Sequence, residues 1–486
     1  MYRHGIYTQE LPTSILPPVR VSSGLIVAFG VAPINQLENP SGAVNKPILA
    51  YSYADAVAKL GYSNDFTNYT LCEVIKVAFG LYGIAPVVFI NVMDPDKHSV
   101  KVDAEEGILV AGKVTLKQSG VINSGVEIKS KSGDKTYTKG VDYTLTFNDV
   151  GFSVISRIEG GGIPEKNSEI TASYDYLDPE KVTTEDIIGG VDVNTGALSG
   201  LEVLNEVYPR TKLIPGQVIA PKFCTNAEVG QLMAAKALLV SDLFKAEALT
   251  DIPTLQVKTY GDVPEWKNLH NWTASNQTVC WPMVKLGDSI YHHSTHLAAA
   301  TCLLDSTIAD IPSSSPSNKP LQMESAVLAD GTEIWLINGS ANYLNGEGIV
   351  TTLNFESWKT WGNRTAAYPQ TTDPKESFRV CRRMFNWVSN TLIKTYWAKI
   401  DDPANRRLID TVVTSANLWF NGLTASQNIA GGSVEFLQSE NPTTDLMDGI
   451  LRFHVYLTPY SPAREIDFIM EYRPDYLNSL FSTDGN

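Results

Sequence analysis

A block of strand-only pattern interrupts a chain that otherwise alternates strands with helices, and this interruption limits the folds open to the sequence. Before residue 100, continuous apolar runs predict buried strands and helical periods lie between them. The predicted strands are 25–31, 46–51 and 85–92, and the predicted helices are 55–60 and 71–81. Continuous apolar strands that alternate with helices favour a sheet covered on both faces.

Residues 101–179 have a different pattern. Short alternating segments are separated by Gly, Asn and Asp at the spacing of roughly 8–12 residues that small sandwiches and barrels show. These segments are 113–117, 126–129, 143–147, 152–155 and 170–174. Because α/β character resumes afterwards, we interpret them as an all-β module inserted into the α/β domain.

The rest of the chain returns to mixed elements. It predicts helices at 226–249, 289–308, 374–399 and 403–423, and strands at 213–219, 254–258, 278–281, 433–437 and 451–457, with a final alternating segment at 465–471. The predicted fold class is an α/β (α+β) multidomain protein whose core domains combine N- and C-terminal parts of the chain, with an inserted small all-β domain and extended terminal arms.

Composition excludes several function classes. The formal net charge of −15 disfavours binding to nucleic acid and to anionic membranes, because both are negatively charged. No apolar stretch approaches the roughly 18 residues of a spanning helix, and the start of the chain does not look like a signal peptide. The five cysteines are widely spaced and form no CxxC pair, which favours buried free thiols and folding in a cytoplasm. We therefore expect a soluble protein with no membrane insertion and no nucleic-acid partner.

Motifs for catalysis are unpersuasive, and we expect neither an enzyme nor a cofactor. His292 and His296 are four residues apart, as paired zinc ligands on a helix are, but His293 stands where a metalloprotease has its general-base Glu. Packed helix histidines are the favoured interpretation, and a metal-dependent hydrolase stays a minor alternative. The chain has no Walker-A loop, and Gly160–Gly162 leads to no predicted helix.

The two chain ends favour a role in contacts between surfaces. The N-terminal segment contains Pro12, Pro17 and Pro18, which favour an extended backbone, and its apolar residues are too sparse to form a core. Extended segments of this kind can add a strand to the sheet edge of a neighbour. Terminal strands that close their own domain are an equally good interpretation from physics alone.

Several motifs resemble the contractile tail sheath proteins. They are GIYTQE at 5–10, LIVAFGVAP at 25–33, NKPIL at 45–49, GIVTTL at 348–353, TWGNRT at 360–365 and FHVYLTP at 453–459. The most distinctive piece is Trp361, Gly362, Asn363, Arg364 and Thr365, and the pattern is most similar to sheaths of P2-like phages.

The resemblance implies a structural subunit that polymerises as stacked hexameric rings around an inner tail tube and contracts to drive the tube through a cell envelope. It implies baseplate and tail terminator proteins as further partners, and a place in a virion tail or a tailocin assembled in the bacterial cytoplasm. The sequence does not separate these particles. A surface-displayed or secreted protein with a glycan-recognising β domain is the alternative.

The resemblance also implies which residues meet neighbouring subunits. The expected inter-subunit positions are Ile6, Tyr7, Leu11, Ile15, Leu16 and Val19 in the N-terminal arm, and Ile466, Phe468 and Met470 in the C-terminal strand. It implies an arm at 1–23, a middle domain at 24–100 plus 180–343, an outer β domain at 101–179, a tube-proximal domain at 344–472 and a tail at 473–486.

Basic residues on the predicted C-terminal helices are candidates to face an acidic tube. They are Arg382, Arg383, Lys394, Arg406 and Arg407. For any single one, a solvated helix face or an internal ion pair is the favoured interpretation. We expect the Trp361–Thr365 motif to be structural, with Trp361 buried, Gly362 in a turn, and Arg364 bound to buried carbonyls or a carboxylate.

Overall fold

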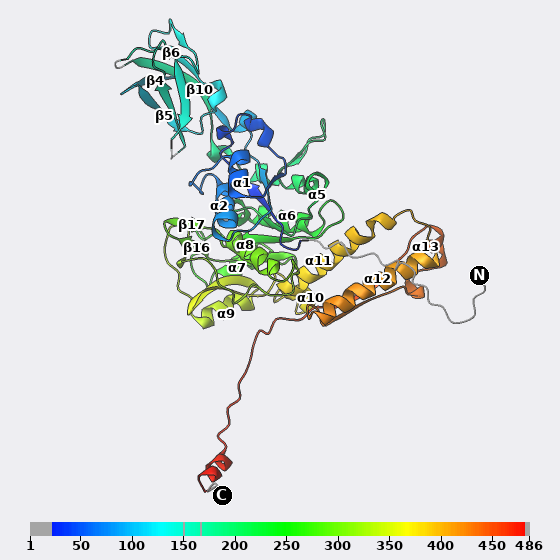
Figure 1. Ribbon diagram of the computed structural model, residues 1–486. Helices are drawn as coiled ribbons and strands as arrows, with labels where there is room; N and C mark the ends of the chain where they lie inside the picture. Colours follow the sequence, from blue (N-terminus) through cyan, green and yellow to red (C-terminus); the bar gives the residue numbers. More distant parts are fainter. Residues whose placement is uncertain (1–21, 149–150, 166–167, 482–486) are drawn as a thin grey trace, which may run out of the picture.

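A computed structural model describes residues 22–148, 151–165 and 168–481 of the chain (Figure 1). In this described part, eight strands form a central sheet in the order β2-β3-β1-β13-β14-β15-β19-β20. They are β2 Ile48–Ala50, β3 Val87–Asn91, β1 Ile26–Gly30, β13 Gln217–Ile219, β14 Glu247–Asp251, β15 Gln277–Cys280, β19 Ile349–Phe355 and β20 Ser357–Trp361. The inner strands run parallel, whereas β2 and β20 pair antiparallel at the two edges.

The sheet is covered on both faces. Every residue of β1, β3, β13, β14 and β15 is buried, and successive side chains of a strand point to opposite faces. The helices α6 (Ala227–Leu238) and α8 (His293–Ser306) pack against the central strands. The other elements of this region are α1 Tyr53–Leu60, α2 Thr70–Ile75, α3 Pro95–His98, α4 Thr184–Ile188, α5 Val207–Thr211, α7 Val263–Leu269, α9 Asn338–Gly346, and the small sheet of β16 Met283–Leu286, β17 Ser289–Tyr291 and β18 Ser325–Val327.

Local signals in the sequence set the helix ends. The Ser52 hydroxyl accepts the Asp55 amide at the start of α1, and Asn226 accepts the Glu228 and Val229 amides at the start of α6. Gly61 ends α1 at φ +75°, where a Cβ would lie 2.4 Å from the Pro33 carbonyl oxygen. Only glycine fits that approach.

The residues between β3 and α4 form a β module with its own core, at the upper left of Figure 1. Its described strands make one sheet of β4 (Ser99–Ile108), β10 (Glu169–Leu177), β6 (Glu127–Ser130) and β7 (Thr136–Tyr137), and another of β5 (Lys113–Ser119), β9 (Phe152–Arg157) and β8 (Tyr143–Phe147). Its core includes Leu116, Ile128, Tyr143, Ile155 and Tyr174. Ser99 and Leu177 pair directly, so the chain enters and leaves the module at one place.

The C-terminal region forms a lobe that projects from the sheet, at the right of Figure 1. It consists of α10 (Pro374–Ser377), α11 (Arg379–Tyr396), α12 (Arg406–Ala425), the hairpin of β21 (Gly431–Glu435) and β22 (His454–Thr458), and α13 (Thr443–Met447). The α12 helix packs on β21, and Tyr396 on α11 donates to the Val412 carbonyl at 3.2 Å. The main apolar core continues into this lobe through Met384, Trp387 and Phe420.

The structure differs from several sequence expectations about secondary structure. The predicted helix 289–308 begins only at His293, because Ser289–Tyr291 form the strand β17, which pairs with β16. The predicted helix 226–249 ends at Leu238, because Ser241 and Asp242 have positive φ in a turn before β14 begins at Glu247. The predicted strand 254–258 is a turn after β14. Residues 465–471 contain no assigned strand, and in the described part of the chain no strand pairs with them.

We predict that the β module can be excised without unfolding the rest. Joining residue 98 to residue 178 through a short Gly-Ser linker should leave a folded protein, because the module has a separate core and its two ends are paired neighbours. Circular dichroism and thermal melting of the shortened chain should show a cooperative transition within a few degrees of the parent. Aggregation or loss of the transition would contradict a separate module.

Candidate functional site: a buried joint and two terminal segments

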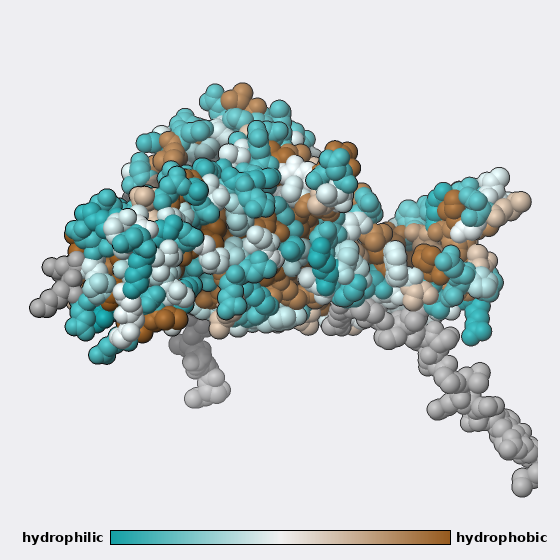
Figure 2. Space-filling model, turned by 90° about the horizontal axis from the view of Figure 1, so that it is seen from above, coloured by the Kyte–Doolittle hydropathy of each residue, from teal (hydrophilic) through white to brown (hydrophobic). Residues whose placement is uncertain are grey.

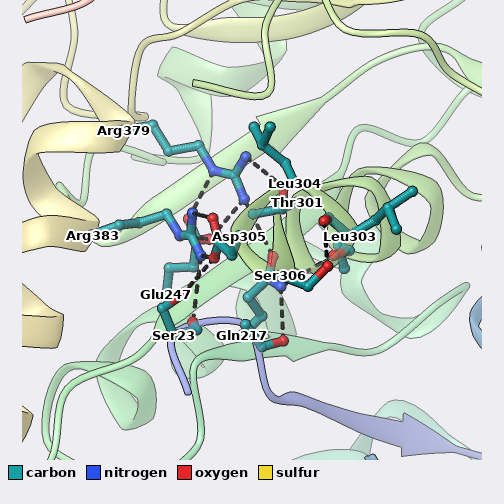
Figure 3. Close-up of polar contacts among 12 residues, drawn as sticks. Ser23, Gln217, Glu247, Thr301, Leu303, Leu304, Asp305, Ser306, Arg379 and Arg383 are labelled. Carbon is teal, nitrogen blue, oxygen red and sulfur yellow. Dashed lines mark hydrogen bonds and ion pairs between the residues drawn. The ribbon is translucent and has the colours of Figure 1, made fainter. Parts of the chain in front are cut away.

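Two arginines of α11 hold the C-terminal lobe to the central sheet (Figure 3). Arg379 makes a two-pronged contact with Glu247 of β14, through Nε to Oε2 at 2.9 Å and Nη2 to Oε1 at 2.7 Å. One turn further, Arg383 contacts Glu247 through Nε at 3.0 Å and also pairs with Asp305 of α8. The exposure of all four side chains is 5% or less. We call these four residues the joint.

The joint also contacts the point at which the N-terminal segment begins. The Ser23 hydroxyl donates to Asp305 Oδ2 at 2.6 Å, and Arg383 Nη2 donates to the Ser23 carbonyl at 3.4 Å. Gln217 of β13 accepts from Arg379, while its own amide donates to the Gly24 and Ala298 carbonyls. One cluster therefore connects the lobe, the sheet and the start of the described chain.

The charges of the joint balance. Burial opposes the charge on Arg383, but Asp305 and Glu247 more than offset it, so its pKa lies above the ordinary value. Two cations and two anions with filled hydrogen bonds can stay buried, whereas a single unpaired one is strongly destabilising. The arrangement is suited to hold parts together.

We predict that Glu247→Ala destabilises the chain by about 3–5 kcal/mol, because it leaves two buried guanidinium groups with one carboxylate. Urea unfolding followed by tryptophan fluorescence measures the change. The control Asp410→Ala removes an exposed ion pair with Arg406 on α12 and should leave the midpoint unchanged. Equal midpoints for the two variants would contradict the role of the joint.

The basic candidates fall into different environments. Arg383 is buried in the joint, so the expectation that it faces a tube is wrong. Arg382 pairs with Glu376 at 3.2 Å, Lys394 is half-buried, and Arg406 pairs with Asp410 at 2.9 Å. Arg407 is exposed. Contact of these four with a tube stays a prediction.

The Trp361–Thr365 motif ties β20 to the start of α11. Gly362 has φ +140°, and a Cβ there would lie 2.9 Å from the Val350 Cα. The Asn363 carbonyl accepts the Arg379 amide, and Thr365 donates to the Ser377 and Glu376 carbonyls. The motif therefore places the first arginine of the joint.

Two details of the motif differ from expectation. Trp361 is only half-buried, with its indole N–H donating to Asn342 at 3.0 Å. Arg364 contacts the faces of Phe378 and Tyr368, at 3.7 and 4.2 Å from the ring centroids, and donates to Ser377 Oγ. Aromatic rings therefore take the place of the expected carboxylate or carbonyls.

The terminal segments differ in what the structure describes. Ile6, Tyr7, Leu11, Ile15, Leu16 and Val19 lie outside the described residues. In the C-terminal segment, Ile466, Phe468 and Met470 are 71%, 87% and 93% exposed, and the backbone from β22 to the short helix η10 (Pro474–Phe481) extends away from the lobe (Figure 1). Such apolar residues in water indicate a surface that a partner covers.

The histidine pair does not form a metal site. His292 precedes α8; its Nδ1 lies 2.8 Å from Glu73 Oε2, and its Nε2 accepts the Lys222 amide at 3.0 Å. His296 lies within α8 with Nδ1 3.3 Å from the Tyr82 hydroxyl. Across the described residues, no group of three or more His, Cys, Asp or Glu side chains could hold a metal ion. Among the described helices, none is long and apolar enough to span a bilayer.

Burial of His296 makes stability depend on pH. Burial lowers the pKa of His296 to about 3, so the folded state keeps the ring neutral while the unfolded chain binds a proton below about pH 6.5. Stability is thus lost as pH falls from 6.5 toward 3. Between pH 7.5 and 5, we predict that the parent loses about 2 kcal/mol more than His296→Leu in urea unfolding. Parallel pH curves for the two proteins would contradict this.

Comparison with known proteins agrees with this architecture. No family profile matches the chain. The tail sheath protein of Burkholderia phage BcepMu is 28% identical over 498 residues, covering 99% of this chain and 98% of that protein. The tail sheath protein of Escherichia phage P2 is 22% identical over 360 residues, covering 73% of this chain and 85% of that protein.

Solved structures share the fold along nearly the whole chain. The sheath complex of an extracellular contractile injection system in the contracted state has a TM-score of 0.57 at 13% identity, over 98% of this chain and 99% of that one. A chain of the anti-feeding prophage baseplate has a TM-score of 0.57 at 14% identity, over 97% and 99%. The fold is that of contractile injection system proteins. Along its whole length the chain is also similar in sequence to a phage tail sheath protein, which supports a contractile tail sheath family.

Sequence reasoning missed the acidic half of the joint. Glu247 was included in a predicted helix, and Asp305 lies near the end of another. A signal was present, since Glu247 and Asp251 flank Ala248, Leu249 and Thr250 within an otherwise apolar stretch. Two arginines four residues apart on α11 are the complementary signal.

Proposed function

We propose that this chain is the structural subunit of a contractile tail sheath, polymerises as stacked hexameric rings around an inner tail tube, and contracts to drive the tube through a target envelope. The observation that carries the proposal is the match to a phage tail sheath protein over 99% of the chain. The glycan-binding alternative has no comparable support.

The physical basis is a division between a rigid body and an exposed C-terminal segment. The joint fixes the lobe to the sheet inside one subunit, while the C-terminal segment presents apolar side chains that the described chain does not cover. In a polymer, main-chain hydrogen bonds made by such segments would keep subunits connected while the folded bodies rotate and slide. Contraction would draw on the free-energy difference between two lattices, without nucleotide or cofactor.

The proposed partners follow from the same account. They are further copies of this chain, the tube protein, and the baseplate and terminator proteins that bound the sheath. One structural neighbour belongs to a sheath complex in the contracted state and another to a baseplate, which supports a polymer with such partners. We propose assembly in the bacterial cytoplasm and no catalytic role.

Electron microscopy of the purified chain tests the proposal. Overexpressed protein, alone and mixed with a candidate tube protein from the same genome, should form hollow cylinders of stacked rings in negative stain. Uniform small particles in both samples at every concentration would contradict it.

We predict that deletion of residues 2–19 leaves a folded chain that no longer forms cylinders, because the deletion removes six apolar residues expected to contact neighbours. Circular dichroism checks the fold, and microscopy counts the cylinders. The matched control Val193→Ser changes one exposed residue in the loop between β11 (Gly190–Val191) and β12 (Leu198–Ser199), and should assemble normally. Cylinders from the deletion variant in normal number would overturn the role of the arm.

A further inference from the structure

The chain contains three Asn–Gly dipeptides, at 338–339, 345–346 and 421–422. Asparagine followed by glycine is chemically labile, because the backbone nitrogen of the next residue can attack the side-chain amide and glycine has no Cβ to hinder the approach. The attack needs a mobile backbone and a backbone N–H that is not held in a hydrogen bond. The fold therefore decides which of the three dipeptides can react.

Two of the three dipeptides are held by the fold. Asn421 and Gly422 lie within the 20-residue helix α12, where the Gly422 N–H donates along the helix. Asn345 lies near the end of α9. With its amide oriented to satisfy its neighbours, the Asn345 side chain donates to the Ile349 and Trp361 carbonyls at 2.8 and 2.9 Å. In both places, hydrogen bonds would have to break before the reaction.

The remaining dipeptide lies at the start of α9, at the lower edge of the body in Figure 1. Asn338 and Gly339 are the first two residues of this helix, and both are exposed. The Asn338 side chain makes no hydrogen bond with any residue that the structure describes. A Cβ added to Gly339 would meet no atom within 4 Å, so the space around this residue is open.

The first turn of α9 is weakly held. Its N-cap is Ile337, which supplies no side-chain hydrogen bond, and the turn contains no acidic residue. The first backbone N–H groups of a helix have no acceptor within the helix, and Gly339 is in that position. Residues 338–340 are Asn, Gly and Ser, which are poor helix formers. Burial of Ala341 and Leu344 anchors the helix only beyond residue 340. The start of α9 can therefore open without unfolding the rest of the helix.

We propose that Asn338 and Gly339 form a site of spontaneous deamidation in the folded subunit. The Gly339 nitrogen loses its proton and bonds to Asn338 Cγ, the Cγ–Nδ2 bond breaks, and ammonia leaves with that proton, which gives a cyclic imide. Water then opens the ring at either carbonyl. Opening at Cγ gives aspartate, and opening at the main-chain carbonyl gives isoaspartate, in which the chain continues through the side-chain carbon. The only co-reactant is water.

Conversion adds a charge to a place with exposed apolar side chains. Hydrophilic residues predominate on the face of the body seen in Figure 2, with hydrophobic residues scattered among them. Trp335 and Ile337, just before α9, are 67% and 74% exposed. Each converted subunit carries one more negative charge beside these two side chains. An aspartate at this position is also favoured by the positive end of the helix dipole.

Ageing of the purified full chain in ¹⁸O-labelled water tests the proposal. Free subunits are incubated at 37 °C between pH 7 and pH 8.5, and the three dipeptides are followed by peptide mapping with electron-transfer dissociation. Asn338 should convert at least tenfold faster than Asn345 and Asn421, with ¹⁸O in both aspartate and isoaspartate. The rate should rise with pH, because the attacking nitrogen must lose its proton. In urea, where the fold no longer protects the other two dipeptides, the three rates should converge.

Four results would overturn the proposal: no conversion at Asn338, equal rates at the three dipeptides of the folded chain, aspartate without isoaspartate, or rates that stay different in urea. The reaction is scored on free subunits and needs no assembly. Its failure is therefore distinguishable from failure of the proposed sheath function.

Two variants separate the contribution of the fold from that of the dipeptide. Gly339→Ala places a Cβ in open space and should slow conversion at least tenfold, whereas the matched control Gly346→Ala, also in open space, should leave the rate at Asn338 unchanged. Ile337→Ser supplies the missing side-chain cap and should slow conversion at least threefold, because it holds the first turn closed. An unchanged rate in Gly339→Ala or in Ile337→Ser would contradict the proposal.

Discussion

The buried pairing of Arg379 and Arg383 with Glu247 and Asp305 is the interaction on which the rest of the molecule depends. It joins a helix of the C-terminal lobe to a central strand and to α8, and it fixes Ser23 at the same point. Because the carboxylates come from the sheet side and the guanidinium groups from the lobe, neither part satisfies its charges alone. The ion pairs fix how the lobe sits on the sheet, and the buried side chains of Met384 and Trp387 add apolar packing to this contact.

A joint of this kind suits a subunit that must move as a body. If the lobe and the sheet are locked in the proposed sheath subunit, displacement between subunits has to be accommodated where the described chain is least anchored, in its C-terminal segment. Phe468, Ile469 and Met470 agree with this account, because they are exposed and no other part of the described chain covers them. The Trp361–Thr365 motif supports the same joint, because it hydrogen-bonds to the start of α11 and so positions Arg379, the first residue of that helix.

The sequence predicted the parts whose signal is local. The alternation of apolar runs and helical periods gave a mixed α/β architecture, and short turns with β-rich segments indicated the module between β3 and α4. The failures occur where distant partners decide the outcome. Glu247 lies in a strand because the sheet provides neighbours on both sides, while its local sequence favours a helix. Arg383 carries a charge, and a charged residue on a helix is expected at the surface. It can be buried because Glu247 of β14 and Asp305 of α8 pair with it, and the sequence does not show that these residues approach it. Residues 465–471 alternate as a strand does, but a strand also needs a partner.

Hydrogen–deuterium exchange on free subunits and on assembled particles tests most directly the claim that a locked body is connected through its ends. The account predicts that amides of residues 460–472 exchange within seconds in the free subunit and become strongly protected in particles, while β14 and α11 are protected in both. Unprotected amides at 460–472 in the particles, or loss of protection in α11 on assembly, would contradict it.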